Sequence, residues 1–343
     1  MENKKRIISA IVASLAMLVI ILDSKTALFS AQQGLQLCIK SVIPSLFPFF
    51  VLSGIISSSL IGQKSKIFSY LGKLCKVPNG AESLLAVGLL SGYPVGAQLV
   101  TQAYKDGNLS SDAARRMLGF CSNAGPAFIF GIIAPMFENP CISWTLWGIH
   151  IMGALAAGWI LPGNVHGAIP LKTAVPSSIS FQLRKSIQNI ATVCGWVVLF
   201  RIILGFSNRW FLWIFPTDIQ ILFSGILELS NGCFLLQNAS CEGARFLLAG
   251  FMISLGGLCV MMQTVSVTQG IGLGLYFPGK VVQTTLTVLC FYLLQPILFE
   301  KQQCAKFDLP CLLGGILTIF FLLIFVRKKV VAFGGRMLYN TGS

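Results

Sequence analysis

Apolar segments separated by short polar stretches fill most of the chain, and two of these segments are interrupted near their middle. Glu82–Tyr104 is divided by Ser91-Gly92-Tyr93-Pro94-Val95-Gly96-Ala97, and Ile219–Gln237 is divided by Glu228-Leu229-Ser230-Asn231-Gly232. In lipid, the N–H and C=O groups that such breaks release are tolerated only where they face protein or a watery cavity. Each arm of the first segment has about eight residues, or about 12 Å of helix, and cannot cross a ~30 Å hydrocarbon core. Paired interrupted segments indicate a binding site.

Other apolar segments are long enough to cross a membrane. The expected spans are Ile7–Phe29, Val42–Ile61, Asp112–Phe137, Ser143–Leu161, Ile190–Phe206, Ala244–Val267, Val281–Leu298 and Leu309–Val326. Two of them contain a break, at Asn123-Ala124-Gly125-Pro126 and at Gly256-Gly257. Residues 64–76 have apolar side chains on one helical face and lysines on the other, which favours a helix in the membrane interface over a solvated loop helix.

The order of span, surface segment, interrupted segment, broken span and plain span occurs twice. We expect an N-terminal transmembrane helix over 1–30, a first repeat over 31–162, a cytoplasmic connection over 163–180, a second repeat over 181–298, and a C-terminal helix with a basic tail over 309–343. If both interrupted segments are re-entrant hairpins, each repeat crosses the membrane three times and the two repeats are inverted. The predicted fold is an all-α polytopic membrane protein with inverted repeats, each with a re-entrant hairpin and a broken helix.

Composition and charge support this fold and set its orientation. The 343 residues are 55% hydrophobic and 10% charged, whereas soluble proteins average about 25% charged residues. In a soluble chain, the net charge of +14 would suggest nucleic acid; here it indicates basic cytoplasmic loops, so we expect no nucleic-acid partner. With hairpins, most of the Lys and Arg residues lie inside, whereas two crossing segments would divide them almost evenly. We therefore expect hairpins and two cytoplasmic termini.

Catalytic and metal chemistry find no support in the sequence. The eleven Cys are scattered, and the two His do not cluster with acids, so we expect neither an enzyme nor a metal or organic cofactor. The sequence leaves open whether disulfides form among the loop residues Cys141, Cys241 and Cys304. His150, beside Trp147, is expected to be a packing residue.

The hairpin tips and helix breaks are the expected substrate site, because helix N-termini there present amides that suit a carboxylate. Packing of helices through small residues is the alternative. The substrate-binding candidates are Ser91, Gly92, Tyr93, Pro94, Gly96, Gln98, Asn123, Gly125, Ser230, Asn231 and Gln263.

Glu228 is the sole acid within an apolar segment, and intramembrane ionisable residues are functional candidates. It is a candidate carrier of a coupling proton or a ligand of a coupling sodium ion. Arg201, in the preceding span, is a candidate partner. A purely structural Glu228–Arg201 pair is the alternative.

The paired motifs Leu90–Ala97 and Gly119–Pro126 resemble those of the nucleoside-recognition, or Gate, domain family, and in particular its sporulation integral membrane proteins of the YlbJ type. The resemblance covers about Leu35 to Leu298, and Gly257–Gln263 matches more loosely. It implies a fold similar to concentrative nucleoside transporters, and movement of a small anionic or aromatic solute such as dipicolinic acid across a cell or forespore membrane by alternating access. The expected partners are membrane lipid, a small-molecule substrate and, as an open alternative, further copies of the chain. Transport of nucleosides or other solutes, and a non-transporting scaffold of a sporulation complex, are the competing functions.

Overall fold

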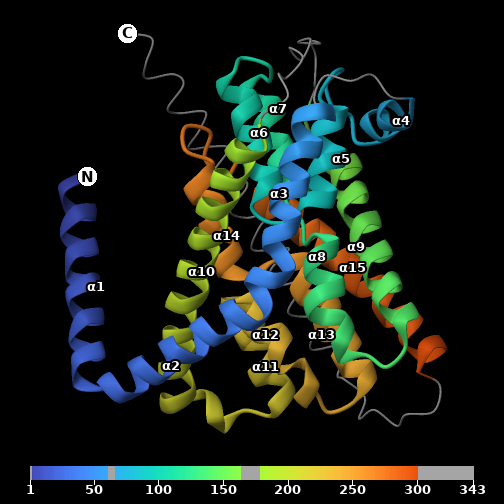
Figure 1. Cartoon of the computed structure of the whole chain (residues 1–343). Coiled ribbons are helices and arrows are strands. Elements are labelled where there is room, and N and C mark those ends of the chain that lie inside the picture. The colour runs from blue at the N-terminus through green and yellow to red at the C-terminus, as the bar shows by residue number, and fades with distance from the viewer. Residues whose placement is uncertain (1, 61–65, 164–177, 300–343) are drawn as a thin grey trace.

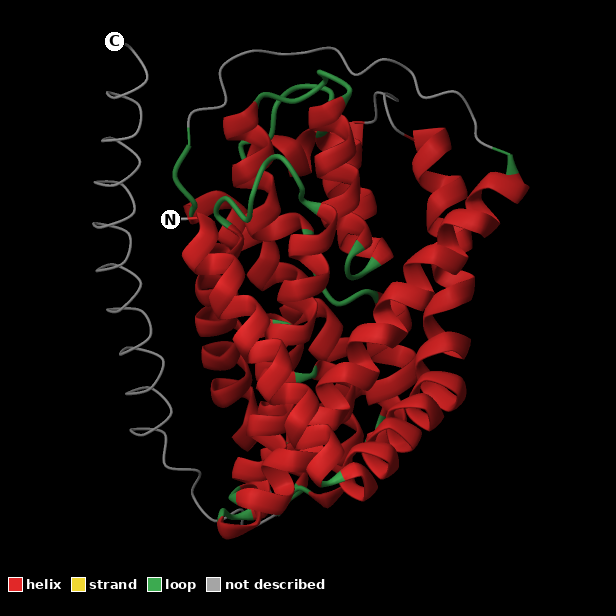
Figure 2. Cartoon of the chain, turned by 90° about the vertical axis from the view of Figure 1, so that its left-hand side faces the viewer, coloured by secondary structure: helices red, strands yellow, loops and turns green. Residues whose placement is uncertain are grey.

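The computed structural model describes residues 2–60, 66–163 and 178–299, and this part of the chain is helical, without strands (Figures 1 and 2). The α-helices are α1 (Glu2–Leu22), α2 (Ser24–Leu37), α3 (Ile43–Leu60), α4 (Lys66–Leu74), α5 (Glu82–Ser91), α6 (Val95–Lys105), α7 (Ser111–Cys121), α8 (Pro126–Phe128), α9 (Pro140–Ile160), α10 (Ile179–Trp210), α11 (Thr217–Leu227), α12 (Leu229–Leu235), α13 (Glu242–Leu255), α14 (Gly257–Val267) and α15 (Tyr276–Leu298). A π-helical turn, Cys38–Val42, joins α2 to α3.

Six helical segments within the described residues are long and apolar enough to cross a membrane. They are Ser24–Ile56, Ser111–Met136, Pro140–Ile160, Ile179–Trp210, Glu242–Val267 and Tyr276–Pro296. The prediction of an all-α polytopic membrane protein is therefore confirmed. The expected span Leu309–Val326, the tail over 309–343 and most of the connection over 163–180 lie outside the described residues.

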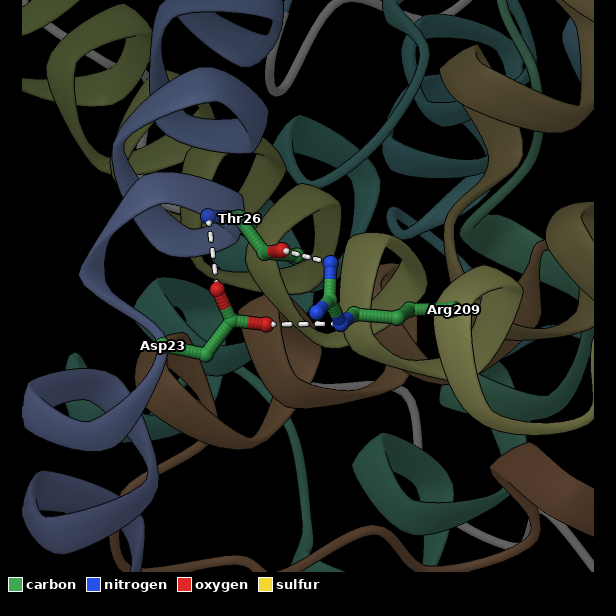
Figure 3. Close-up of polar contacts among 3 residues, drawn as sticks. All are labelled: Asp23, Thr26 and Arg209. Atoms are coloured by element: carbon green, nitrogen blue, oxygen red, sulfur yellow. Dashed lines mark hydrogen bonds and ion pairs between the residues drawn. The ribbon is translucent and has the colours of Figure 1, made fainter.

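The N-terminal helix is shorter than the predicted Ile7–Phe29, because the chain turns at Asp23 (Figure 1). The Asp23 carboxylate accepts a hydrogen bond from the Thr26 backbone N–H at 3.2 Å and so caps the new helix α2. Its second oxygen pairs with Arg209 Nε at the end of α10, 3.0 Å away (Figure 3).

The contact with Thr26 and, to a smaller extent, the charge of Arg209 lower the pKa of Asp23. Ionised Asp23 therefore stabilises the folded protein at pH values above the ordinary carboxyl pKa. This stabilisation is lost as the pH falls through the lower pKa that Asp23 has in the folded protein.

Both interrupted segments fold back on themselves. Helices α5 and α6 pack against each other at one end of the bundle, whereas α11 and α12 pack against each other at the opposite end (Figure 1). The breaks fall where the sequence predicts them, at Gly92–Pro94 and at Glu228.

The two broken spans are also confirmed. The first is interrupted between Cys121 and Pro126 and the second at Gly256. Loops consequently lie inside the bundle as well as at its ends (Figure 2).

Several boundaries differ from the prediction. Helix α15 begins at Tyr276 rather than Val281, because Pro278 is tolerated in a first helical turn, where its missing N–H costs no bond. Lys280, which directly precedes the predicted span Val281–Leu298, is consequently inside this helix and only 1% exposed. Helix α10 extends the predicted Ile190–Phe206 at both ends. Among the cysteines, Cys141 is free and Cys241 is disulfide-bonded.

Arg116, within the predicted span Asp112–Phe137, is buried in α7, and it joins α7 to two other parts of the bundle. Its guanidinium donates hydrogen bonds to the carbonyl oxygens of Cys75 (2.8 Å) and Lys76 (3.2 Å), after α4. It also donates to the carbonyl oxygens of Gly158 and Leu161 at the end of α9. A single side chain thus satisfies the backbone at two helix C-termini.

We expect Arg116→Met to destabilise the protein by about 2–5 kcal/mol, because it leaves buried carbonyls without donors. Thermal unfolding of the detergent-purified protein measures this loss. Arg115→Met is the matched control, because the exposed Arg115 side chain donates to one carbonyl oxygen among the described residues, that of Ile271 at 3.2 Å. Equal melting temperatures for the two variants would show that the Arg116 contacts do not hold α7 in place.

Candidate functional site

The loop between α5 and α6 lies directly against the break between α7 and α8. Gly92 has φ +79°, and a Cβ built on it would lie 3.0 Å from Gly125 N. A Cβ on Gly125 would lie 2.9 Å from Gly92 Cα, and one on Gly96 would collide with the Cys121 carbonyl oxygen. These predicted site glycines therefore let two backbones approach each other, which is the packing role given above as the alternative.

The second helix pair repeats this arrangement. A Cβ on Gly257, at the break between α13 and α14, would lie 2.7 Å from the Gly225 carbonyl oxygen and 3.0 Å from that of Ile226, near the end of α11. Gly232 of α12 also packs on the Gly225 backbone. Each helix pair therefore meets the break of the broken span that follows it.

Lys280 lies where these parts converge. Its Nζ donates hydrogen bonds to Gln283 Oε1 (2.9 Å), to Asn123 Oδ1 (3.1 Å) and to the Tyr93 hydroxyl (3.3 Å). Tyr93 comes from the α5–α6 loop, Asn123 from the break after α7, and Gln283 from α15. The structure therefore brings two of the predicted site residues, Tyr93 and Asn123, onto one lysine.

Further hydrogen bonds turn all three oxygens toward the lysine. Asn123 Nδ2 donates to the Phe120 carbonyl oxygen at 2.6 Å, and Gln283 Nε2 donates to that of His150 at 3.2 Å. The Tyr93 hydroxyl donates to the Ile253 carbonyl oxygen of α13 at 3.0 Å. The site thus links the first helix pair to both broken spans and to α9 and α15.

No carboxylate among the described residues forms an ion pair with Lys280. Within the described ranges, the one ion pair between side chains is that of Arg209 with Asp23, at the far end of α10. Three neutral oxygens can accept hydrogen bonds from an ammonium group, but they leave its unit charge uncompensated. An intramembrane charge without a partner in the chain suggests a partner that comes from outside it.

Segments that form this lysine site also carry polar atoms with no hydrogen-bond partner among the described residues. The hydroxyls of Ser91 and Ser122 are buried and without a hydrogen bond, at the α5–α6 loop and the break after α7 respectively. His150, which is fully buried, has Nδ1 3.5 Å from Ser254 Oγ and 3.4 Å from Gln283 Nε2, and its Nε2 has no partner in the described structure. A packing role alone, as expected from the sequence, leaves that nitrogen unexplained.

A cavity of about 290 Å³ lies beside Lys280. Its wall is almost entirely apolar and includes the aromatic rings of Phe251, Tyr276 and Phe277. Thr284 and Thr285 also line it, and their buried hydroxyl oxygens have no hydrogen bond. Such a space suits an apolar or aromatic group better than a charged one.

Glu228 and Arg201 do not form the ion pair considered above as the structural alternative. Glu228 caps α12: its carboxylate oxygens accept from the backbone N–H groups of Ser230 (3.0 Å) and Asn231 (2.6 Å) and from Asn231 Nδ2 (2.7 Å). Arg201 donates to Gln33 Oε1 of α2 instead. The backbone amides of Ser230 and Asn231, at the break between α11 and α12, are therefore occupied by the chain's own carboxylate.

The remaining predicted residues lie apart from the lysine contacts. Gln98 exchanges hydrogen bonds with Asn189 of α10, at 2.8 and 3.2 Å. Gln263 Nε2 lies 3.4 Å from Cys259 Sγ, one turn earlier in α14. Pro94 N-caps α6. None of these three donates to or accepts from Lys280 in the contacts of the described residues.

Sequence reasoning missed Lys280 and Gln283. The signal that could have identified Lys280 is its position one turn inside an apolar helix. The predicted span began at Val281, however, and therefore left Lys280 outside the helix. Gln283 follows three residues later and shares the helix face with Lys280.

We expect Gly96→Ala to lower the yield of folded protein, because the added methyl group would meet the Cys121 carbonyl oxygen. Gly148→Ala in α9 is the control, since a Cβ there has nothing within 4 Å. Size-exclusion profiles of both variants in detergent measure the difference. Equally monodisperse, equally abundant variants would contradict the close contact.

Comparison with known proteins places the chain near one curated protein. The sporulation integral membrane protein YlbJ of Bacillus subtilis (strain 168) is 24% identical over 313 residues, with 77% of each chain covered. No family model matches the chain, and no solved structure matches it. The chain is thus a membrane protein with a distant homologue that is named for sporulation.

Proposed function

We propose that this protein is a transporter that moves a small anionic solute across a membrane by alternating access, with dipicolinate as the leading candidate. The observation that carries the proposal is Lys280, a buried lysine with no carboxylate partner among the described residues, at the point where the first helix pair, both broken spans and α15 meet. An anion would supply the missing charge. The sporulation name of the Bacillus relative favours a solute of spore formation.

The arrangement of the two helix pairs supports an inverted repeat. They lie at opposite ends of the bundle, and each meets the break of the following span through glycine backbone (Figure 1). In this proposal both pairs are re-entrant hairpins, as in concentrative nucleoside transporters, and each closes the site from one side of the membrane.

Charge supports the orientation. The exposed residues Lys73, Lys105 and Arg115 lie near the end of α4, at the end of α6 and in the first turns of α7, and these three helices lie at the same end of the bundle (Figure 1). The positive-inside rule makes this end cytoplasmic. The disulfide-bonded Cys241 begins α13 at the opposite end, which suits a side outside the reducing cytoplasm.

In the proposed mechanism, each part of the site has a separate role. Lys280 binds the acid group, and the unpaired hydroxyls of Ser91 and Ser122 are available as further donors. The apolar cavity beside Lys280 accepts the ring. Lys280 is almost fully buried, and in this proposal movement of one helix pair admits the solute to it while movement of the other pair releases the solute on the far side.

A scaffold function has one observation in its favour, namely that the three oxygens around Lys280 could serve a purely structural lysine. Nucleosides are neutral and would not need this lysine. An uptake assay with dipicolinate and with a nucleoside, on purified protein in proteoliposomes, distinguishes anion transport from nucleoside transport and from a scaffold function.

We expect Lys280→Met to abolish dipicolinate uptake and to weaken binding by about 10- to 100-fold, because a hydrogen bond to a charged group contributes about 1.5–3 kcal/mol. Gln283→Glu should also abolish uptake, because it places a carboxylate where Gln283 Oε1 now lies 2.9 Å from Lys280 Nζ. That carboxylate would pair with Lys280 and compete with the anionic solute. Lys105→Met, at the exposed end of α6, is the control and should transport normally. Normal uptake by both site variants would contradict the proposal, and a stable protein without uptake or binding of any tested solute would favour the scaffold.

A further inference from the structure

In the part of the chain that the structure describes, the surroundings of Lys280 contain several ionisable groups but no acid in ion-pair contact with it. Tyr93 of the α5–α6 loop and Tyr276 of α15 present their rings, with centroids 5.2 and 6.0 Å from Nζ. Cys121 of α7 interacts electrostatically with the lysine, and His150 of α9 is reached through Gln283. From α13, the Ile253 carbonyl oxygen contacts Tyr93. These groups are neutral in their ordinary states near pH 7.

Two protonation states of Lys280 are compatible with this environment, and they differ in charge. A neutral amine donates two hydrogen bonds, enough for two of the three surrounding oxygens, and brings no charge into the bundle. An ammonium group donates three, but it places an uncompensated positive charge in a low-dielectric interior. An anion bound beside Lys280 would remove that penalty and favour the ammonium.

We propose that Lys280 takes up a proton when the solute anion binds and gives it up when the anion leaves, so that this lysine couples solute movement to protons. The inference rests on the proposed transport function and adds the coupling ion and its carrier. A water-derived proton joins the free amine, and the resulting ammonium pairs with the anion. One positive charge therefore accompanies each anion, and transport of a monoanion moves no net charge.

This assignment moves the coupling role away from Glu228. The Glu228 carboxylate already accepts three hydrogen bonds from the first turn of α12, and it holds that helix as a cap. Lys280, in contrast, contacts only neutral oxygens, and an incoming anion could replace one of them as the acceptor once the lysine is protonated. The lysine, not the glutamate, is thus the group whose charge depends on the solute.

The test measures proton uptake by the full-length wild-type protein in detergent. Benzoate is the probe, because its carboxylate stays ionised from about pH 6 to about pH 9. Titration calorimetry should give an affinity that falls with rising pH, by up to about tenfold per pH unit once free Lys280 is deprotonated. In weakly buffered solution near the upper end of that range, a pH dye should report about one proton taken up per benzoate bound.

Lys280→Arg is the matched variant, since arginine stays charged throughout this pH range. It should bind benzoate with an affinity that does not change with pH and without proton uptake. If the variant does not fold, the wild-type titration still tests whether anion binding is accompanied by proton uptake.

The outcomes separate the two proposals. Binding by the wild type without proton uptake and without pH dependence would overturn the coupling role and leave anion transport standing. If neither benzoate nor dipicolinate binds at any pH, the proposed function fails, and the coupling role fails with it. A pH dependence that persists in Lys280→Arg would assign the titration to another group and would also overturn this inference.

Discussion

The contact of Lys280 with Tyr93, Asn123 and Gln283 is the interaction on which the centre of this protein depends. A charged or chargeable nitrogen in the middle of a membrane protein is costly unless its environment supplies both hydrogen bonds and opposite charge. The chain supplies the first through three oxygens, each oriented by its own hydrogen bond to a backbone carbonyl. It does not supply the second within the described residues, and an anionic solute would complete the site.

Close glycine contacts make this convergence geometrically attainable. Side chains at Gly92 and Gly125 would hold the α5–α6 loop away from the break after α7, and Tyr93 could not then reach α13 and α15. The same kind of contact, between Gly225 and Gly257, joins the second helix pair to its own broken span. Glycine at these positions therefore serves backbone packing directly and the site indirectly, so the packing and binding interpretations of the motif are compatible.

The breaks were predictable because Gly and Pro disrupt helices through local backbone chemistry. The fold-back of α5–α6 was predictable because each arm is too short to span a membrane alone and because hairpins place most Lys and Arg residues on one side. The turn at Asp23 and the start of α15 before Lys280 depend on side-chain capping and on the place of a proline within a helical turn, which an apolar pattern does not encode. The pairing of Arg201 with Gln33, rather than with Glu228, depends on which helices become neighbours. The lysine site arises only in the fold, because its residues come from segments up to 190 positions apart.

Accessibility of the α5–α6 loop tests alternating access at this site most directly. Ser91 is 3% exposed and its hydroxyl has no hydrogen bond, so Ser91→Cys is a small change at the place where the solute is expected to bind. Membrane-impermeant thiol reagents would be applied to each side of oriented vesicles, with unsubstituted protein as the background for the native cysteines. We expect slow labelling from both sides, and saturating dipicolinate should suppress it from both. Labelling from one side only, or labelling that dipicolinate does not change, would contradict alternating access around this site.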